Sequence, residues 1–288
     1  MRLLMFSVHG GAARFGVETA AGIVDVNAAD PALPSTLHAY LERLEELGSR
    51  LAAVGTSRPA KTVARENVIL HPPIQFPQKI LCIGLNYRDH AAEVKMELPQ
   101  YVTVFPKWPN TLIGDGAPIV IPTESHRIDY EAELTFVIGK RGRHIPKERA
   151  YEHVAGYTIM NDVSIRDYQM RTSQWAMGKT WDTHGPLGPV MVTTDEIPDP
   201  QNLFIRTSIG GEMLQDSHTS QLVFDVPTLV AELSAVMTLE PGDIVATGTP
   251  AGVGTSRNPR RWMKAGERVR IEIEKIGVLE NPLVSATP

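Results

Sequence analysis

Apolar residues at the start of the chain occur in short runs separated by glycine, over residues 2–26. This pattern is typical of small antiparallel strands joined by hairpins. A helix is predicted after Pro34 and Ser35, because four leucines that follow fall roughly on one helical face: Leu37, Leu41, Leu44 and Leu51.

Residues 56–77 are polar and contain several prolines, with one short apolar run at residues 66–70 that predicts a strand. We interpret this stretch as a linker. The sequence therefore predicts a small N-terminal α/β domain over residues 1–72 and a larger domain over residues 73–288.

Strands are predicted more often than helices in the larger domain. Apolar runs or alternating patterns predict strands at residues 80–84, 114–122, 130–139, 156–162, 243–248 and, as the last element, 268–274. Helices are predicted at residues 88–94, at 146–154, from Ser164 onward and at 228–237. Because these helices do not alternate regularly with the strands, the pattern favours a β-rich α+β fold over a doubly wound parallel sheet.

Composition narrows the class of protein. A hydrophobic fraction of 42% and a net charge of −5 exclude a disordered chain, and the absence of a basic cluster argues against nucleic-acid binding. No apolar run approaches the ~18 residues that cross a bilayer, and the apolar start is too short for a secretory signal. We therefore expect a cytoplasmic protein, whose single cysteine, Cys82, packs in an apolar strand.

Two acidic residues in one predicted strand are the most informative feature. Glu131 and Glu133 share a face because the side-chain period of a strand is two. Two close carboxylates in a partly apolar setting need a cation, and Asp162, at the end of another predicted strand, could complete an all-oxygen site. Oxygen ligands favour Mg²⁺, Mn²⁺ or Ca²⁺. The alternative is an edge strand that exposes two solvated glutamates.

A histidine and a glutamate three residues apart form a second candidate. On a helix, Glu93 would lie beside His90, so that the carboxylate holds one imidazole nitrogen and leaves the other free as a base. The alternative is a surface helix with an acidic residue that lies near the histidine by chance.

Further candidates surround these two groups. Arg166 and Gln169 would share a helical face near Asp162, and a guanidinium suits a carboxylate ligand. Lys179 lies next to a glycine, and its ammonium could stabilise negative charge that develops during a reaction. The alternative is a lysine that is simply solvated, as most lysines are. The loop 247–254 matches neither nucleotide-binding glycine motif, so no nucleotide cofactor is expected. Its backbone amides and the Thr249 hydroxyl could instead face a small anion. The alternative is a tight turn without a ligand.

Taken together, five segments resemble the fumarylacetoacetate hydrolase family over about residues 73–280: LCIGLNYRDHAAE, IDYEAELTFVIGK, VAGYTIMNDVSIRDYQ, GKTWDTHGPLGP and LEPGDIVATGTPAGVG. The resemblance implies a rolled mixed β-sheet around a metal site, in a homodimer. It implies Mg²⁺ or Mn²⁺ held by Glu131, Glu133 and Asp162.

The same resemblance assigns roles to the remaining candidates. It implies that His90 and Glu93 form the acid/base pair on a mobile lid and that Lys179 stabilises oxygen charge. Substrate contacts are implied for three further residues: Arg166, Gln169 and Thr249.

The resemblance also implies the chemistry. We expect a hydrolase that cleaves a carbon–carbon bond in an acylpyruvate-like or 2,4-diketo acid, with water activated by the histidine. Because the same enolate forms when carbon dioxide leaves, a decarboxylase acting on an oxaloacetate-like acid is the nearest alternative, followed by a 2-hydroxydienoate isomerase or hydratase. A metal-binding protein without turnover would not need the lid pair.

Overall fold

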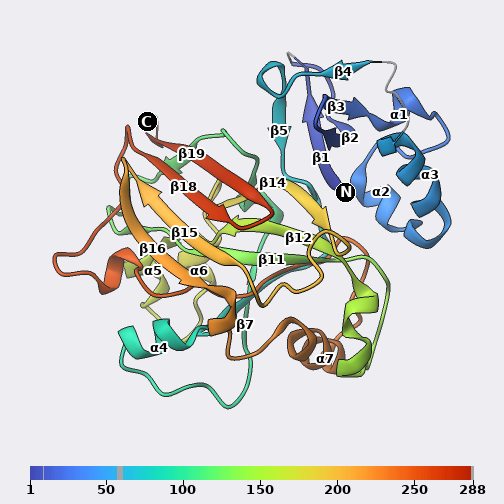
Figure 1. Ribbon diagram of the computed structural model, residues 1–288. Helices are drawn as coiled ribbons and strands as arrows, with labels where there is room; N and C mark the ends of the chain where they lie inside the picture. Colours follow the sequence, from blue (N-terminus) through green and yellow to red (C-terminus); the bar gives the residue numbers. More distant parts are fainter. Residues whose placement is uncertain (9, 57–60, 287–288) are drawn as a thin grey trace.

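Strands make up most of the structure, a computed structural model that describes residues 1–8, 10–56 and 61–286 (Figure 1). Within these residues, twelve strands form one mixed sheet. In it β5 (Ile69–His71) pairs with β1 (Arg2–Ser7), and β8 (Leu112–Ile113) pairs with β14 (Gly185–Thr193). The other ten strands follow one path: β4 (Thr62–Val63), β3 (Gly22–Asp25), β2 (Arg14–Thr19), β1 (Arg2–Ser7), β14 (Gly185–Thr193), β12 (Val154–Asn161), β11 (Ala132–Ile138), β17 (Ile244–Ala246), β6 (Ile80–Gly84) and β7 (Thr103–Lys107).

A second sheet packs beside the first, and a two-stranded sheet pairs β10 (Ile128–Asp129) with β13 (Ser164–Ile165). The second sheet has the order β16 (Glu212–His218), β15 (Phe204–Ile209), β18 (Arg268–Ile273), β19 (Gly277–Ser285) and β9 (Ile119–Ile121). Most neighbours are antiparallel, but three pairs are parallel: β6 with β17, β8 with β14 and β9 with β19. The predicted strand-rich mixed fold is therefore confirmed.

The helices are short and lie outside the sheets. The α-helices are α1 (Val26–Ala29), α2 (Leu37–Leu41), α3 (Leu44–Thr56), α4 (Arg88–Glu93), α5 (Arg166–Gln169), α6 (Ala176–Lys179) and α7 (Val226–Val236). Single 3₁₀ segments are η1 (Arg65–Asn67), η2 (Pro109–Thr111), η3 (Lys147–His153), η4 (Thr219–Gln221) and η5 (Gly254–Ser256).

Four predicted elements differ from the structure. The single helix expected after Pro34 is divided into α2 and α3, and the helix expected at residues 146–154 is the 3₁₀ segment η3. The helix expected from Ser164 begins at Arg166, because Ser164 pairs with Asp129 in the β10–β13 ladder. The strand at residues 268–274 is not the last element, since β19 follows it and pairs on both sides.

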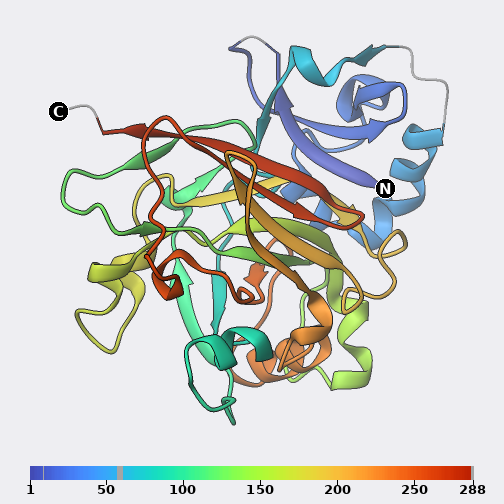
Figure 2. The same ribbon diagram turned by 60° about the vertical axis from the view of Figure 1, so that its left-hand side comes forward.

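The N-terminal segment shares a sheet and a core with the rest of the chain. Leu3 of β1 pairs with Met191 of β14. One hydrophobic cluster contains Leu3 and Phe15 together with Cys82 and Met191. Figures 1 and 2 show β1–β5 and α1–α3 gathered on one side of the molecule, where β1 joins the other strands of the twelve-stranded sheet through β14. The predicted linker holds β4, η1 and β5, and its residues 57–60 lie outside the described residues.

Candidate metal centre and catalytic dyad

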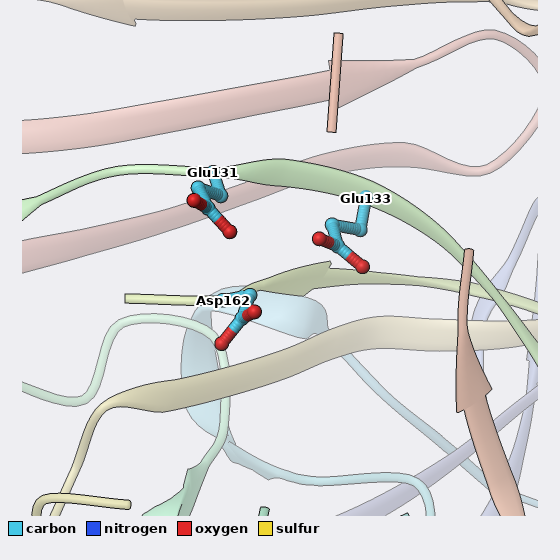
Figure 3. Close-up of side chains that lie close together, drawn as sticks. All are labelled: Glu131, Glu133 and Asp162. Atoms are coloured by element: carbon cyan, nitrogen blue, oxygen red, sulfur yellow. The ribbon is translucent and has the colours of Figure 1, made fainter. Parts of the chain in front are cut away.

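Three carboxylates converge where β11 begins and β12 ends (Figure 3). Glu131 directly precedes β11, Glu133 lies within it and Asp162 follows β12. The two strands are antiparallel, and the Asp162 amide donates to the Glu131 carbonyl oxygen over 2.9 Å. One oxygen from each of the three carboxylates lies within 4.8 Å of the other two. The structure therefore brings together the three residues that the sequence predicts as metal ligands.

The chemistry of this donor set fits a hard divalent cation. All three side chains are buried, and Glu133 accepts a hydrogen bond from the Gly248 amide over 2.9 Å. Burial raises the pKa of Glu133 well above its ordinary value, and the neighbouring carboxylates Asp162 and Glu131 raise it further. A divalent ion offsets this repulsion, and a set of carboxylate oxygens suits Mg²⁺ or Mn²⁺ better than a softer metal.

Two buried lysines accompany the carboxylates. The Lys179 ammonium, on α6, donates to Glu131 Oε2 over 2.6 Å and to Asp162 Oδ2 over 2.7 Å. Lys107, at the end of β7, donates to Asp162 Oδ1 over 2.7 Å and to the Lys179 carbonyl oxygen. Burial raises the pKa of Asp162, but the two ammonium groups outweigh burial and hold this pKa below its ordinary value. Asp162 is therefore charged.

Arg166 joins the cluster from α5, as the sequence predicts. Its Nε donates to Asp129 Oδ2 over 2.8 Å, and its Nη1 lies 2.7 Å from Glu131 Oε1 and 2.9 Å from Gln169 Oε1. Among the described residues, neither Arg166 Nη2 nor Asn161 Nδ2 has a hydrogen-bond partner, although both atoms are buried. Buried donors without acceptors are costly, so these two atoms suit an anionic ligand.

The structure pairs His90 with Glu93 on α4, the two residues that the sequence predicts as an acid/base dyad. His90 Nδ1 lies 2.9 Å from Glu93 Oε2, and the other Glu93 oxygen, Oε1, accepts from the Gly252 amide over 2.9 Å. The carboxylate holds Nδ1 as a donor, which leaves Nε2 of His90 with a free lone pair. The dyad therefore has the arrangement of a general base.

The loop 247–254 differs from the prediction that its amides face an external anion. The Gly248, Gly252 and Gly254 amides donate to carboxylates of the protein itself: Glu133, Glu93 and Asp129. These three glycine amides are therefore occupied, and the loop connects the carboxylate cluster to the dyad. Thr249, whose residue surface is 6% exposed, lies between the first two of these contacts.

Sequence reasoning missed Lys107, Asp129 and Asn161. Asp129 could have been found, because Asp129, Glu131 and Glu133 alternate with a period of two. Lys107 had no local signal, since its partner Asp162 lies 55 residues away in the chain.

Comparisons with known proteins identify relatives of this chain. The family described as "Fumarylacetoacetate (FAA) hydrolase C-terminal" matches residues 79–284. A Xenopus laevis protein named "Oxaloacetate tautomerase fahd2, mitochondrial" is 45% identical over 289 residues, which cover 99% of this chain and 90% of that protein.

Two solved structures share the fold over the whole chain. Fumarylacetoacetate hydrolase from Exiguobacterium antarcticum has a TM-score of 0.86 and 34% identity, covering 99% of this chain and 100% of that one. Maleylpyruvate hydrolase from Sphingobium sp. SYK-6, in complex with manganese(II) and pyruvate, has a TM-score of 0.82 and 32% identity, with both chains covered completely.

The comparisons correct one prediction. The Xenopus laevis relative is named as mitochondrial, which contradicts the cytoplasmic location predicted from the sequence. That prediction depended on the lack of a secretory signal and of an apolar run long enough to cross a bilayer, neither of which distinguishes the cytoplasm from an organelle. In the described part of the chain, no helix is long and apolar enough to cross a membrane.

Proposed function

The chain belongs to the fumarylacetoacetate hydrolase family, and from this premise we propose that it catalyses keto–enol tautomerisation of a small 2-oxo acid such as oxaloacetate. The observation that carries the proposal is the Glu93–His90 dyad, which is joined to the carboxylate cluster through the Gly252 and Gly248 amides. The relative named as an oxaloacetate tautomerase supports the choice of substrate.

The carboxylate cluster provides the binding end of the site. Glu131, Glu133 and Asp162 would hold Mg²⁺ or Mn²⁺, which when bound draws electron density from a carbonyl and makes the adjacent C–H bond more acidic. Arg166 Nη2 and Asn161 Nδ2, both buried without partners among the described residues, donate to the substrate carboxylates.

The dyad provides the proton transfer. His90 Nε2 takes a proton from the carbon next to the carbonyl while Glu93 holds Nδ1 and stabilises the imidazolium. Lys179 stabilises the negative charge that develops on the carbonyl oxygen. The His90 imidazolium, directly or through water, returns its proton to this oxygen, so that the keto and enol forms interconvert without net loss of atoms.

Hydrolysis of a carbon–carbon bond is the second candidate. It is supported by the structural similarity to maleylpyruvate hydrolase. In that reaction the same imidazole would take the proton from water instead of from carbon, and loss of carbon dioxide would pass through the same enolate. Assembly as a homodimer stays a prediction of the family resemblance.

The test is an ultraviolet assay of the oxaloacetate enol, run beside two assays of pyruvate formation, one from oxaloacetate and one from maleylpyruvate. We expect the keto–enol rate above the buffer background to fall at least ~100-fold after exhaustive chelation and to return with Mn²⁺ or Mg²⁺. Pyruvate formed with carbon dioxide would instead indicate decarboxylation, and pyruvate released from maleylpyruvate would indicate hydrolysis.

Two variants locate the reaction at the carboxylate cluster. Glu131→Ala should lose Mn²⁺ binding and activity together, whereas Glu124→Ala, which removes an exposed carboxylate, should keep both. Full activity after metal removal, or parental Mn²⁺ binding by Glu131→Ala, would contradict the proposal.

A further inference from the structure

A buried glutamine lies where the two large sheets and the loop 247–254 meet. Gln215 is on β16 of the second sheet and is 1% exposed. Its amide makes four hydrogen bonds: Oε1 accepts from the Ala132 amide over 3.1 Å and from Thr207 Oγ1 over 2.7 Å, and Nε2 donates to Thr249 Oγ1 over 2.8 Å and to the Pro250 carbonyl oxygen over 2.9 Å. The polar atoms of this side chain are all satisfied.

Two backbone groups determine which way the Gln215 amide points. The Ala132 N–H can only donate, so the amide oxygen must face it. The Pro250 carbonyl can only accept, so the amide nitrogen must face the loop. Turning the amide over would place two donors together and two acceptors together, which costs both hydrogen bonds.

This fixed orientation determines the role of the Thr249 hydroxyl. Because Nε2 of Gln215 donates to Thr249 Oγ1, the oxygen is an acceptor in that contact and its own proton points elsewhere. Among the described residues, none accepts a hydrogen bond from this hydroxyl. Thr249 therefore carries a free donor at a nearly buried position.

The position of Thr249 places this donor beside the proposed reaction. The preceding Gly248 amide binds the cluster carboxylate Glu133, and the Gly252 amide, three residues later, binds Glu93 of the dyad. A substrate lying between the cluster and the dyad would contact this stretch of the loop.

We propose that Gln215 is a positioning residue that fixes the Thr249 hydroxyl as a hydrogen-bond donor to an anionic oxygen of the substrate. The inference rests on the proposed oxo-acid function and adds a residue that does not itself touch the substrate. Strand β16 of the second sheet would thereby help to select ligands that place a hydrogen-bond acceptor, such as a carboxylate or an enolate oxygen, opposite the Thr249 hydroxyl.

The isosteric variant Gln215→Glu tests this role. The second carboxylate oxygen of the glutamate would accept a hydrogen bond where Nε2 of Gln215 donates one. The Thr249 hydroxyl would then donate to residue 215 and would no longer donate to the substrate. We expect pyruvate, titrated calorimetrically into the Mn²⁺-loaded protein, to bind about tenfold more weakly, because a hydrogen bond to a charged group is lost. The affinity for Mn²⁺ should change less than the affinity for pyruvate. The control Gln78→Glu adds the same charge at an exposed position and should bind pyruvate as the parent does.

A double-mutant cycle separates positioning from a general structural role. Thr249→Val should lose about the same pyruvate affinity as Gln215→Glu, and the double variant should lose no more than either alone. Additive losses, or parental pyruvate affinity in Gln215→Glu, would overturn the inference.

Two further variants keep the test decisive if Gln215→Glu does not fold. Gln215→Met removes the donor without adding charge and should also weaken pyruvate binding, while Thr249→Ser, which keeps a hydroxyl, should bind pyruvate more tightly than Thr249→Val. Equal affinities for the serine and valine variants would overturn the inference. Failure of the Mn²⁺-loaded parent itself to bind pyruvate would instead overturn the proposed oxo-acid site, and with it this role for Gln215.

Discussion

At the scale of single residues, Glu93 has two partners that together determine which ring nitrogen of His90 carries the proton. Its Oε1 accepts from the Gly252 amide, and its Oε2 faces His90 Nδ1. In Glu93→Gln the amide oxygen must stay with the Gly252 N–H, so the amide NH₂ faces Nδ1 and the ring proton moves to Nε2. We expect about 100-fold slower tautomerisation with Mn²⁺ binding retained, measured by steady-state kinetics.

A matched variant controls for the change of charge on the same segment. Glu97→Gln alters an exposed carboxylate just beyond α4 and should keep the parental rate. A Glu93→Gln protein with the parental rate would show that the dyad takes no part in proton transfer.

Lys107 is the second residue with a specific expectation, because it compensates the buried charge of Asp162. Lys107→Met leaves that carboxylate with one ammonium neighbour instead of two. We expect the free energy of unfolding in urea to fall by about 3 kcal/mol. Lys264→Met, at an exposed position, should change it by less than about 0.5 kcal/mol, and equal effects of the two variants would contradict a compensating role for Lys107.

The residues that could be predicted from the sequence are those whose relation is local. Glu131 with Glu133 follows the period of a strand, and His90 with Glu93 follows the period of a helix. The contact between Gly252 and Glu93 joins residues 159 apart, and no periodicity reports such a pair. Long-range partners of the site therefore emerged only from the fold.

At the scale of elements, α4 depends on its attachments. A helix of six residues is unstable alone, and this one is tied down at both ends. Arg88 donates to the Leu222 carbonyl oxygen over 2.6 Å, Asp89 accepts from the Ser217 hydroxyl, and Glu93 accepts from Gly252. These contacts hold the dyad to β16 and to the loop 247–254.

Removing one attachment should loosen the helix without unfolding the protein. In Ser217→Ala we expect the amides of residues 88–93 to exchange about fivefold faster with deuterium, because one hydrogen bond worth ~1 kcal/mol is lost. Ser208→Ala, on the neighbouring strand β15, is the control and should leave this exchange unchanged. Unchanged exchange in Ser217→Ala would mean that the other contacts suffice to hold α4.

Elements with strong apolar patterns could be predicted well, and elements defined by pairing could not. The strand predicted at residues 80–84 coincides with β6, which has no polar side chain, and the helix predicted at 228–237 overlaps α7 (Val226–Val236), which is mostly apolar. Serine commonly begins a helix, yet the backbone of Ser164 pairs with Asp129 in a strand ladder. Tertiary pairing overrode a local preference there.

At the scale of the whole molecule, residues 1–72 share a sheet and a hydrophobic core with the remainder. We therefore expect both parts to unfold in one transition, although the sequence suggests two domains. The four tryptophans, Trp108, Trp175, Trp181 and Trp262, all lie beyond residue 72, so their fluorescence reports on the larger part alone. Hydrogen exchange of α2 and α3 reports on the smaller part, and its midpoint in urea should coincide with the fluorescence midpoint. Earlier opening of α2 and α3 would show that residues 1–72 fold independently.

The pairing of β1 with β14 also has a consequence during synthesis of the chain. β1 is synthesised before its partner β14, which ends at Thr193, about 120 residues after residue 72. At 5–20 residues per second, a ribosome takes roughly 6–24 s to make that stretch. During this time Arg2 and Leu3 of β1 lack their pairing with β14, and the cluster that contains Leu3 and Met5 lacks Met191. The nascent chain thus exposes apolar surface at β1 before the partner strand has been made, which makes chaperone binding to this segment an advantage.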